Sequence, residues 1–112
     1  MSVVNVKPGV QFSMIAPGGF CILSAIQRAA VACGIDLTIT SGTDGEHSGP
    51  ADPHHTGNAY DVRTHDMTPE QKDQVLSAIT TVLGSRFYGF LEAPGSDNEH
   101  LHVQVARGTT YP

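Results

Sequence analysis

The chain of 112 residues has little cysteine, little positive charge and no long apolar run. Its two cysteines, Cys21 and Cys33, are too few for a disulfide framework. On one helix their spacing would separate them by about 18 Å, which is further than a disulfide reaches. We therefore expect two free thiols that behave as small buried apolar groups.

The shortage of basic residues excludes one class of partner. Lys and Arg number 6 against 11 Asp and Glu, which leaves a net charge of −5, whereas sequence-independent nucleic-acid binding needs a basic surface. Ser24, Gln27 and Arg28 interrupt the longest apolar stretches, so we expect no membrane insertion. The opening residues, MSVVNVKPGV, lack the pattern of a secretory signal. We expect a protein that is cytoplasmic when made.

Two segments show helical spacing of apolar residues, in a chain whose length suits one domain over 1–112. The first covers 20–33, between the glycines of APGG at 16–19, which we expect to break the chain, and a stop at Gly34. The second runs to Gly84. Its start signal is a capping box with proline at the first helical position, formed by Thr68, Pro69 and Gln71.

Four further segments have the composition and alternation of strands. They cover residues 35–42, 58–64, 86–93 and 100–106. Residues 42–56 are rich in glycine and proline and are expected to form a loop. The sequence therefore predicts a single compact α+β domain. Its mainly antiparallel sheet of about four strands would carry two main helices on one face.

Strand alternation assigns the polar side chains of these segments to a common face. In HLHVQV three apolar residues can point into the core: Leu101, Val103 and Val105. His100 and His102 then share the opposite face with Gln104. In the segment 58–64, Asp61 and Arg63 share one face in the same way. Paired histidines are unusual on a half-buried strand, where Thr, Lys or Glu are the usual residues.

Two short stretches, PHHTGNAYDVR at 53–63 and NEHLHVQV at 98–105, concentrate residues that bind zinc. Catalytic Zn²⁺ takes three protein ligands, from imidazole nitrogens and carboxylate oxygens, and leaves a fourth position to water. His54, Asp61 and His102 would supply these three ligands. His55 is the main rival of His54 as a ligand.

The two motifs together resemble a known family. From His54 the chain spells H-x-x-G-x-A-x-D, and EHLH is an E-x-x-H motif that contains H-x-H. This order resembles the zinc D-Ala-D-Ala carboxypeptidases and dipeptidases and the phage L-alanyl-D-glutamate endopeptidases, which share a compact α+β fold with the amino-terminal domain of hedgehog proteins. The resemblance extends over roughly residues 18 to 106 and includes GIDLTITSG after the first helix. The small size is most similar to a phage-encoded member.

The resemblance implies a role for each matching residue. His54, Asp61 and His102 match the zinc ligands of the family, and Glu99 matches its general base. His100 matches the residue that, in some relatives, hydrogen-bonds the water or the reacting carbonyl.

The chain departs from the family at two places. Asp52 stands where serine is common, two residues before the first ligand. Many relatives also follow SG with an aromatic residue and an arginine that polarises the scissile carbonyl, where this chain has Thr43 and Asp44. An oxyanion needs a preorganised donor, and His47 or Arg63 would be its replacement. Otherwise His47 is an ordinary loop residue and Arg63 forms a structural ion pair.

The resemblance implies a zinc peptidase that cleaves peptidoglycan stem peptides containing D-residues and acts at the bacterial cell wall after release. It leaves open whether the bond is D-Ala-D-Ala or L-Ala-D-Glu, and a monomer is the expected state. Two alternatives belong to other classes of protein. One is a non-catalytic zinc-binding module of the same fold, and the other is a structural protein, such as a virion component, whose histidines are incidental.

Overall fold

A computed structural model describes residues 2–45, 49 and 51–106 of the chain. Its elements confirm the predicted α+β class, with two helices and five strands. In chain order they are β1 (Val4–Val6), α1 (Pro17–Cys33), β2 (Leu37–Ser41), β3 (Ala59–Arg63), α2 (Pro69–Leu83), β4 (Phe87–Glu92) and β5 (His100–Val105).

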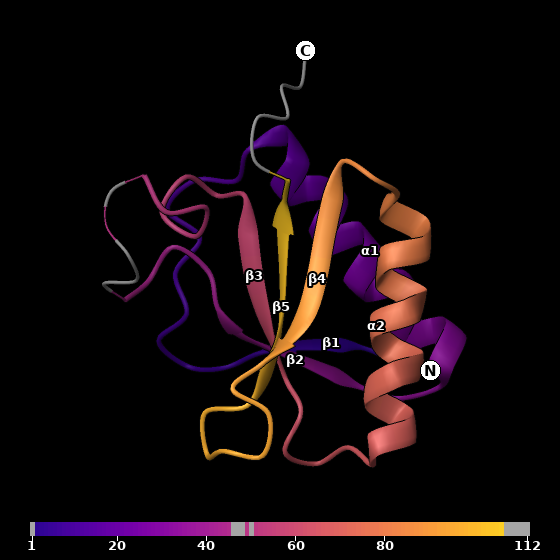
Figure 1. Ribbon diagram of the computed structural model, residues 1–112. Coiled ribbons are helices and arrows are strands. Elements are labelled where there is room, and N and C mark those ends of the chain that lie inside the picture. The colour runs from indigo at the N-terminus through magenta and orange to yellow at the C-terminus, as the bar shows by residue number, and fades with distance from the viewer. Residues whose placement is uncertain (1, 46–48, 50, 107–112) are drawn as a thin grey trace.

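The strands form one sheet in the order β1-β2-β3-β5-β4, and both helices lie on the same side of it (Figure 1). All neighbouring pairs are antiparallel except β1 and β2. The sheet is thus mainly antiparallel, as expected. The fifth strand, β1, was not expected from the sequence, because a strand of 3 residues is too short for alternation to show.

The first helix begins earlier than its apolar spacing indicated. It starts at Pro17 rather than at residue 20, so the glycines of APGG open the helix instead of breaking the chain. Proline suits this first position because its missing N–H has no helical partner there. A Cβ atom on Gly19 would lie 2.0 Å from the carbonyl oxygen of Gly57. The glycine therefore allows α1 to approach the loop that follows β2.

The second helix begins as predicted. The Thr68 side chain accepts a hydrogen bond from the Gln71 N–H, and the Gln71 side chain accepts one from the Thr68 N–H. This capping box fixes the start of α2. Neither helix in the described part of the chain is long and apolar enough to cross a membrane.

The predicted burial of the cysteines is wrong, although both are free as expected. Cys21 is exposed and Cys33 is only partly buried. The buried stripe of α1 follows Ile22, Ile26 and Ala29, and Cys21 falls outside it. Cys21 therefore adds nothing to the core, whereas Cys33 packs against it from the edge.

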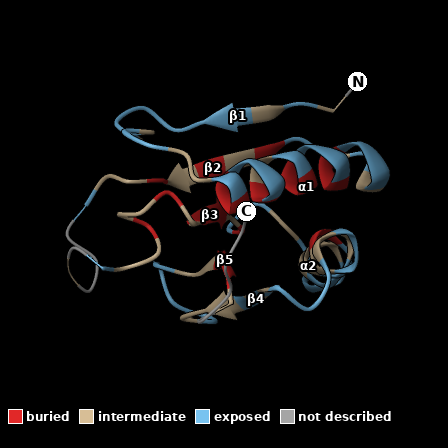
Figure 2. Ribbon diagram, turned by 90° about the horizontal axis from the view of Figure 1, so that it is seen from above, coloured by how far each residue is buried: buried red, intermediate tan, exposed pale blue. Residues whose placement is uncertain are grey.

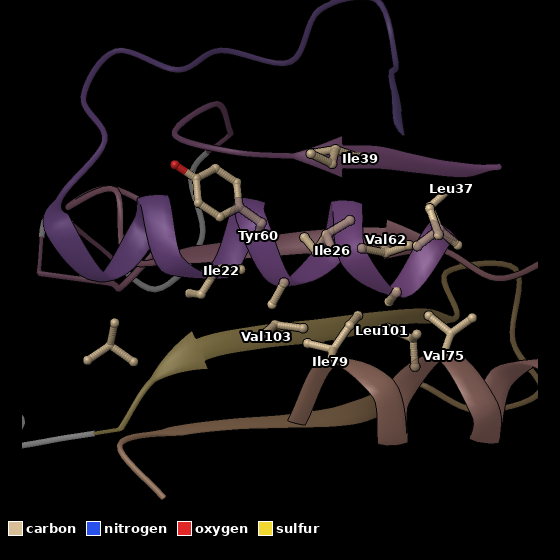
Figure 3. Close-up of a cluster of buried hydrophobic side chains, with 14 residues drawn as sticks. Ile22, Ile26, Leu37, Ile39, Tyr60, Val62, Val75, Ile79, Leu101 and Val103 are labelled. Atoms are coloured by element: carbon tan, nitrogen blue, oxygen red, sulfur yellow. The ribbon is translucent and has the colours of Figure 1, made fainter. Parts of the chain in front are cut away.

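The core lies between the helices and one face of the sheet. Ile22 and Ile26 of α1 and Ile79 of α2 pack against the inner faces of β3 and β5 (Figure 3). In both helices the buried residues lie on the inner side and the exposed residues on the outer side (Figure 2). Three residues of β5 that were expected to be internal are buried: Leu101, Val103 and Val105. Burial of each such side chain stabilises the folded state by about 1.5–3 kcal/mol. The opposite face of β3 and β5 is left to polar residues.

Candidate metal centre

His54 is positioned by tight turns in the loop between β2 and β3. Its N–H donates to the Asp52 Oδ1 at 2.9 Å, and its carbonyl accepts from the Gly57 N–H at 3.2 Å. The Asn58 N–H donates to the Pro53 carbonyl at 2.8 Å. These bonds fold the stretch 52–58 back on itself just before β3. The imidazole of His54, which is only 3% exposed, is thereby held beside the sheet.

The structure explains why the H-x-x-G-x-A-x-D motif has small residues at its G and A positions. Gly57 has a φ of 75°, in the left-handed region that favours glycine. A Cβ atom there would lie 2.5 Å from the Met14 carbonyl oxygen. The Gly57 carbonyl accepts from the Ala16 N–H at 3.2 Å, which ties the loop to the chain entering α1. Ala59 is fully buried at the start of β3.

Asp61 and His102 face each other across two paired strands. They are register partners in β3 and β5, and their side chains leave the sheet on the face that the helices do not cover. Asp61 Oδ1 lies 3.0 Å from His102 Nδ1 and 3.2 Å from His54 Nε2. The two imidazole nitrogens are 3.3 Å apart. Asp61 is 7% exposed and His102 is 8% exposed, so the three atoms form a buried triangle.

The second nitrogen of each histidine has its own acceptor. His54 Nδ1–H donates to the Gly42 carbonyl at 3.0 Å. His102 Nε2–H donates to Gln104 Oε1 at 2.8 Å, and the Gln104 amide N–H donates to the Val105 carbonyl. When both imidazoles are neutral, these protons leave the lone pairs of His54 Nε2 and His102 Nδ1 facing each other and the Asp61 carboxylate; a further proton on either nitrogen would instead donate to Asp61. Three converging acceptors call for a cation between them, and outer hydrogen bonds of this kind orient metal-binding histidines.

The triangle has dimensions that fit a tetrahedral metal ion. Ligands about 2.0–2.1 Å from a tetrahedral ion lie roughly 3.3 Å from one another, close to the three separations observed. His54, Asp61 and His102 thus form a group that can hold a metal ion. They also line a cavity of about 520 Å³, which we call the metal cavity. A small movement apart of the three side chains would admit the ion.

The charges of the cluster depend on one another. Burial opposes ionisation of Asp61, but its hydrogen bonds with His102 and His54 outweigh burial and hold the pKa of Asp61 well below its usual range. Burial likewise opposes protonation of His102, but the hydrogen bonds with Asp61 and Gln104, together with nearby negative charge, raise the pKa of His102. The site thus favours a carboxylate and a positive charge beside it.

A carboxylate that the motifs did not indicate lies at the edge of this cluster. Glu92 is the register partner of His100, across β4 and β5. Its Oε1 lies 3.6 Å from His100 Nε2 and 3.8 Å from His102 Nδ1. The Glu92 side chain is 45% exposed and lines the metal cavity. Its position depends on strand pairing, so the spacing of the two motifs carried no signal for it.

His100 joins the two carboxylates. Its Nδ1–H donates to the Asn98 carbonyl at 2.7 Å, which turns Nε2 toward the cluster. Nε2 lies 3.5 Å from Asp61 Oδ2 and 3.6 Å from Glu92 Oε1. The structure therefore brings His100 to the site, outside the triangle of His54, Asp61 and His102. With Glu92 and His102 it forms a second group that could hold a metal ion.

Glu99 is not brought to the cluster. Its carboxylate accepts from Thr64 Oγ1 at 2.7 Å and from the Gly95 N–H at 2.8 Å, and it pairs with Lys72 of α2. The Gly95 N–H, followed by Lys72 and Thr64, lowers the pKa of Glu99 to about 2. Glu99 precedes β5, and its bonds to Thr64 and Lys72 hold its carboxylate away from the triangle. A carboxylate held in this way is a weak proton acceptor.

Arg63 and His47 were the two candidates to replace the arginine that polarises the carbonyl in many relatives, and only Arg63 lies in the described part of the chain. Arg63 lines a smaller cavity beside the metal cavity, together with Glu99 and His100. It forms no ion pair with any described residue, so the structural ion pair considered for it has no partner in that part of the chain. His47 lies outside the described residues.

The loop residues that replace the arginine motif have structural contacts. Asp44 Oδ1 accepts from the Gln11 and Gly42 N–H groups at 3.0 and 2.8 Å. Thr43 Oγ1 accepts from the Ser13 N–H at 2.9 Å. These bonds fasten the N-terminal segment to the loop.

His55, the rival of His54, points elsewhere. Its Nε2 lies 2.8 Å from the Gly45 carbonyl oxygen, to which it donates. The described metal-binding groups do not include it. The geometry therefore favours His54 as the ligand.

Comparison of the chain with protein-family models, with curated proteins and with solved structures gave no match. The class of protein is therefore defined by the fold and the site alone. It is a compact α+β domain with a buried His/Asp/His cluster that can hold a metal ion.

Proposed function

We propose that this protein is a zinc-dependent peptidase that cleaves peptidoglycan stem peptides containing D-amino acids. One observation carries the proposal. Ligand atoms from two distant motifs, in His54, Asp61 and His102, meet at 3.0–3.3 Å, and each imidazole is oriented by an outer hydrogen bond. The resemblance of these motifs to the D-Ala-D-Ala carboxypeptidases and L-alanyl-D-glutamate endopeptidases supports the substrate class.

When bound, a zinc ion would polarise the peptide carbonyl and acidify a water molecule. Glu92 is the carboxylate best placed to take up a proton, because it lines the metal cavity and lies within 4 Å of both His100 and His102. It would accept a proton from the attacking water and deliver it to the leaving amine. This role was expected for Glu99, whose carboxylate has other partners. His100, the register partner of Glu92, would hold the carboxylate at the cavity by packing beside it.

The test combines metal analysis with an assay on purified peptidoglycan. We expect about one zinc ion per chain and release of new amino groups from the stem peptides. A chelator should abolish the release, and added zinc should restore it. Zinc-loaded protein that releases no amino groups from any stem peptide would overturn the peptidase proposal. Absence of zinc binding would overturn the metal site as well, and would leave the structural protein as the better alternative.

A second function is favoured by one observation at the loop after β2. Where many relatives carry an arginine, Asp44 is engaged with the backbone of Gln11 and Gly42. A protein without this donor could keep the fold and the metal and serve as a non-catalytic zinc-binding module. Zinc content without peptide hydrolysis distinguishes this module from the enzyme.

A further inference from the structure

A second, smaller cavity adjoins the metal cavity. It measures about 170 Å³, and we call it the side cavity. The two cavities share four lining residues, which are Lys7, Thr40, Asn98 and His100. At about 30 Å³ per water molecule, the side cavity holds a group the size of a carboxylate with a few waters. One bound molecule can therefore occupy both.

The side cavity is lined by more positive charge than unpaired negative charge, in an acidic protein. Lys7 and Arg63 both line it, and neither forms an ion pair with a described residue. Two acidic residues also line it, but Glu99 is already paired with Lys72, which leaves Asp97 alone against two cations. The whole chain has only 6 Lys and Arg, so two unpaired cations at one cavity mark it as an anion site.

The two cations come from separate elements that the fold brings together. Lys7 directly follows β1, and its N–H donates to the Ile39 carbonyl of β2 at 2.9 Å. Arg63 is the last residue of β3 and lies two positions beyond Asp61 on the same face. Two residues along a strand cover about 7 Å. The Arg63 backbone therefore lies about that far from the Asp61 backbone.

We propose that Lys7 and Arg63 bind a carboxylate of the substrate, on the residue that follows the scissile bond. This inference rests on the proposed peptidase function. In both candidate bonds that residue is a D-amino acid with a free α-carboxylate: the terminal D-Ala in one, and D-Glu linked onward through its γ-carboxyl group in the other. Its carboxylate carbon is three bonds from the scissile carbonyl carbon, at most about 4 Å away. A carbonyl at the metal thus brings the carboxylate within reach of the side cavity.

The experiment compares each stem peptide with its α-carboxamide, which removes the charge and keeps the shape. The peptides are an acylated L-Lys-D-Ala-D-Ala and L-Ala-γ-D-Glu-L-Lys. Hydrolysis is followed by kcat and KM, and binding to the zinc-loaded protein by calorimetry. The variants are Lys7→Met and Arg63→Gln. Arg28→Ala removes the same charge from the exposed side of α1 and serves as the control. Zinc content and melting temperature are measured for every variant.

We expect the unmodified protein to prefer the acid over the amide by about 10- to 100-fold, the scale of a charge-assisted hydrogen bond. In Lys7→Met and in Arg63→Gln, the KM for the acid should rise until most of this preference is lost. The KM and kcat for the amide should stay as in the unmodified protein. Arg28→Ala should keep the full preference for the acid. If the unmodified protein binds and hydrolyses the acid and the amide equally well, the carboxylate site is overturned, but the peptidase proposal is not. A preference that survives both substitutions would also overturn it. If neither peptide is cleaved, the peptidase fails, and calorimetry still decides whether the acid binds more tightly through Lys7 and Arg63.

Discussion

Asp61 Oδ1 and His102 Nδ1 lie 3.0 Å apart, although 41 residues separate them in the chain. They are direct partners across two antiparallel strands, so the backbone ladder itself sets their distance. His54 completes the triangle from a loop. Two of the three candidate ligands thus stand on rigid elements, which is the arrangement that holds a metal site most accurately.

Zinc should stabilise the protein measurably. An ion that binds only the folded state at 100 times its dissociation constant adds about 2.7 kcal/mol. His102→Ala removes one of three ligands and should abolish both the bound zinc and this gain. His55→Ala, which alters the neighbouring loop without touching the triangle, should retain both. Metal analysis and thermal unfolding with and without zinc measure the effect. Full zinc retention in His102→Ala would contradict the assigned ligand set.

Glu92→Gln should lower turnover by about 100-fold or more, the usual loss for a general acid–base group. Its zinc content should stay nearly unchanged when the ion is held by His54, Asp61 and His102. Glu92 also belongs, with His100 and His102, to a second group that could hold a metal ion, so loss of zinc in Glu92→Gln would place the ion there. Glu99→Gln is the matched control, since it makes the same change at the other carboxylate near the H-x-H motif and should alter turnover by less than about threefold. The measurement is the rate of amino-group release. If Glu99→Gln lowers turnover strongly and Glu92→Gln does not, then Glu99 is the catalytic carboxylate.

Glu99 should instead contribute to acid stability. Its pKa in the folded protein is about 2, against about 4.3 in an unfolded chain. A depressed pKa stabilises the fold above the unfolded value, and this stabilisation is lost as the pH falls through the folded value. The urea midpoints of the unmodified protein and Glu99→Gln should therefore differ most above about pH 4.3 and converge toward pH 2.

Gln104 should act as a positioning residue for His102. Its Oε1 accepts the His102 Nε2–H at 2.8 Å, so its loss frees the ring to rotate and to change tautomer. Gln104→Leu should weaken zinc binding by about 10- to 100-fold, as is typical of such outer partners. Gln104→Glu keeps an acceptor and should preserve the affinity. Competition with a coloured chelator measures it, and equal weakening in both variants would point to general disruption of β5.

Gly57→Ala should destabilise the fold by more than about 1 kcal/mol, because alanine is strained at positive φ and its Cβ would lie 2.5 Å from the Met14 carbonyl oxygen. Gly95→Ala shares the positive φ but meets no atom within 4 Å, so it separates strain from collision. Urea unfolding in the presence of a chelator gives both values. Equal losses would show that the packing of the loop on the start of α1 adds nothing.

Alternation along the strands was enough to predict much of the site. It placed His102 and Gln104 on one face of β5, and Asp61 and Arg63 on one face of β3, as the register has them. The periodicity of the helices and the capping box of α2 were equally readable, because each is a local property of consecutive residues. The motif from His54 carried its own turn signals in Gly57.

Strand alternation could not predict which distant segments come into contact. Glu92 reaches the cluster only through the pairing of β4 with β5, and Lys7 only through the pairing of β1 with β2. The role expected for Glu99 came from resemblance, and its contacts with Lys72 of α2 and with Thr64 depend on the tertiary structure. The exposure of Cys21 shows the limit of residue type as a guide to burial, since the packing of α1 decides it.

The order of the strands also bears on how the protein is made. β5 follows β4 in the chain, yet in the sheet it lies between β3 and β4. On the ribosome, β3 and β4 emerge before the strand that joins them. A nascent chain that ends before His100 has neither a partner for β4 nor the last candidate ligand, His102. Insertion of one late strand therefore completes the sheet and brings the three candidate ligands together in the same step, so a newly made chain lacks the complete cluster until its sheet is whole.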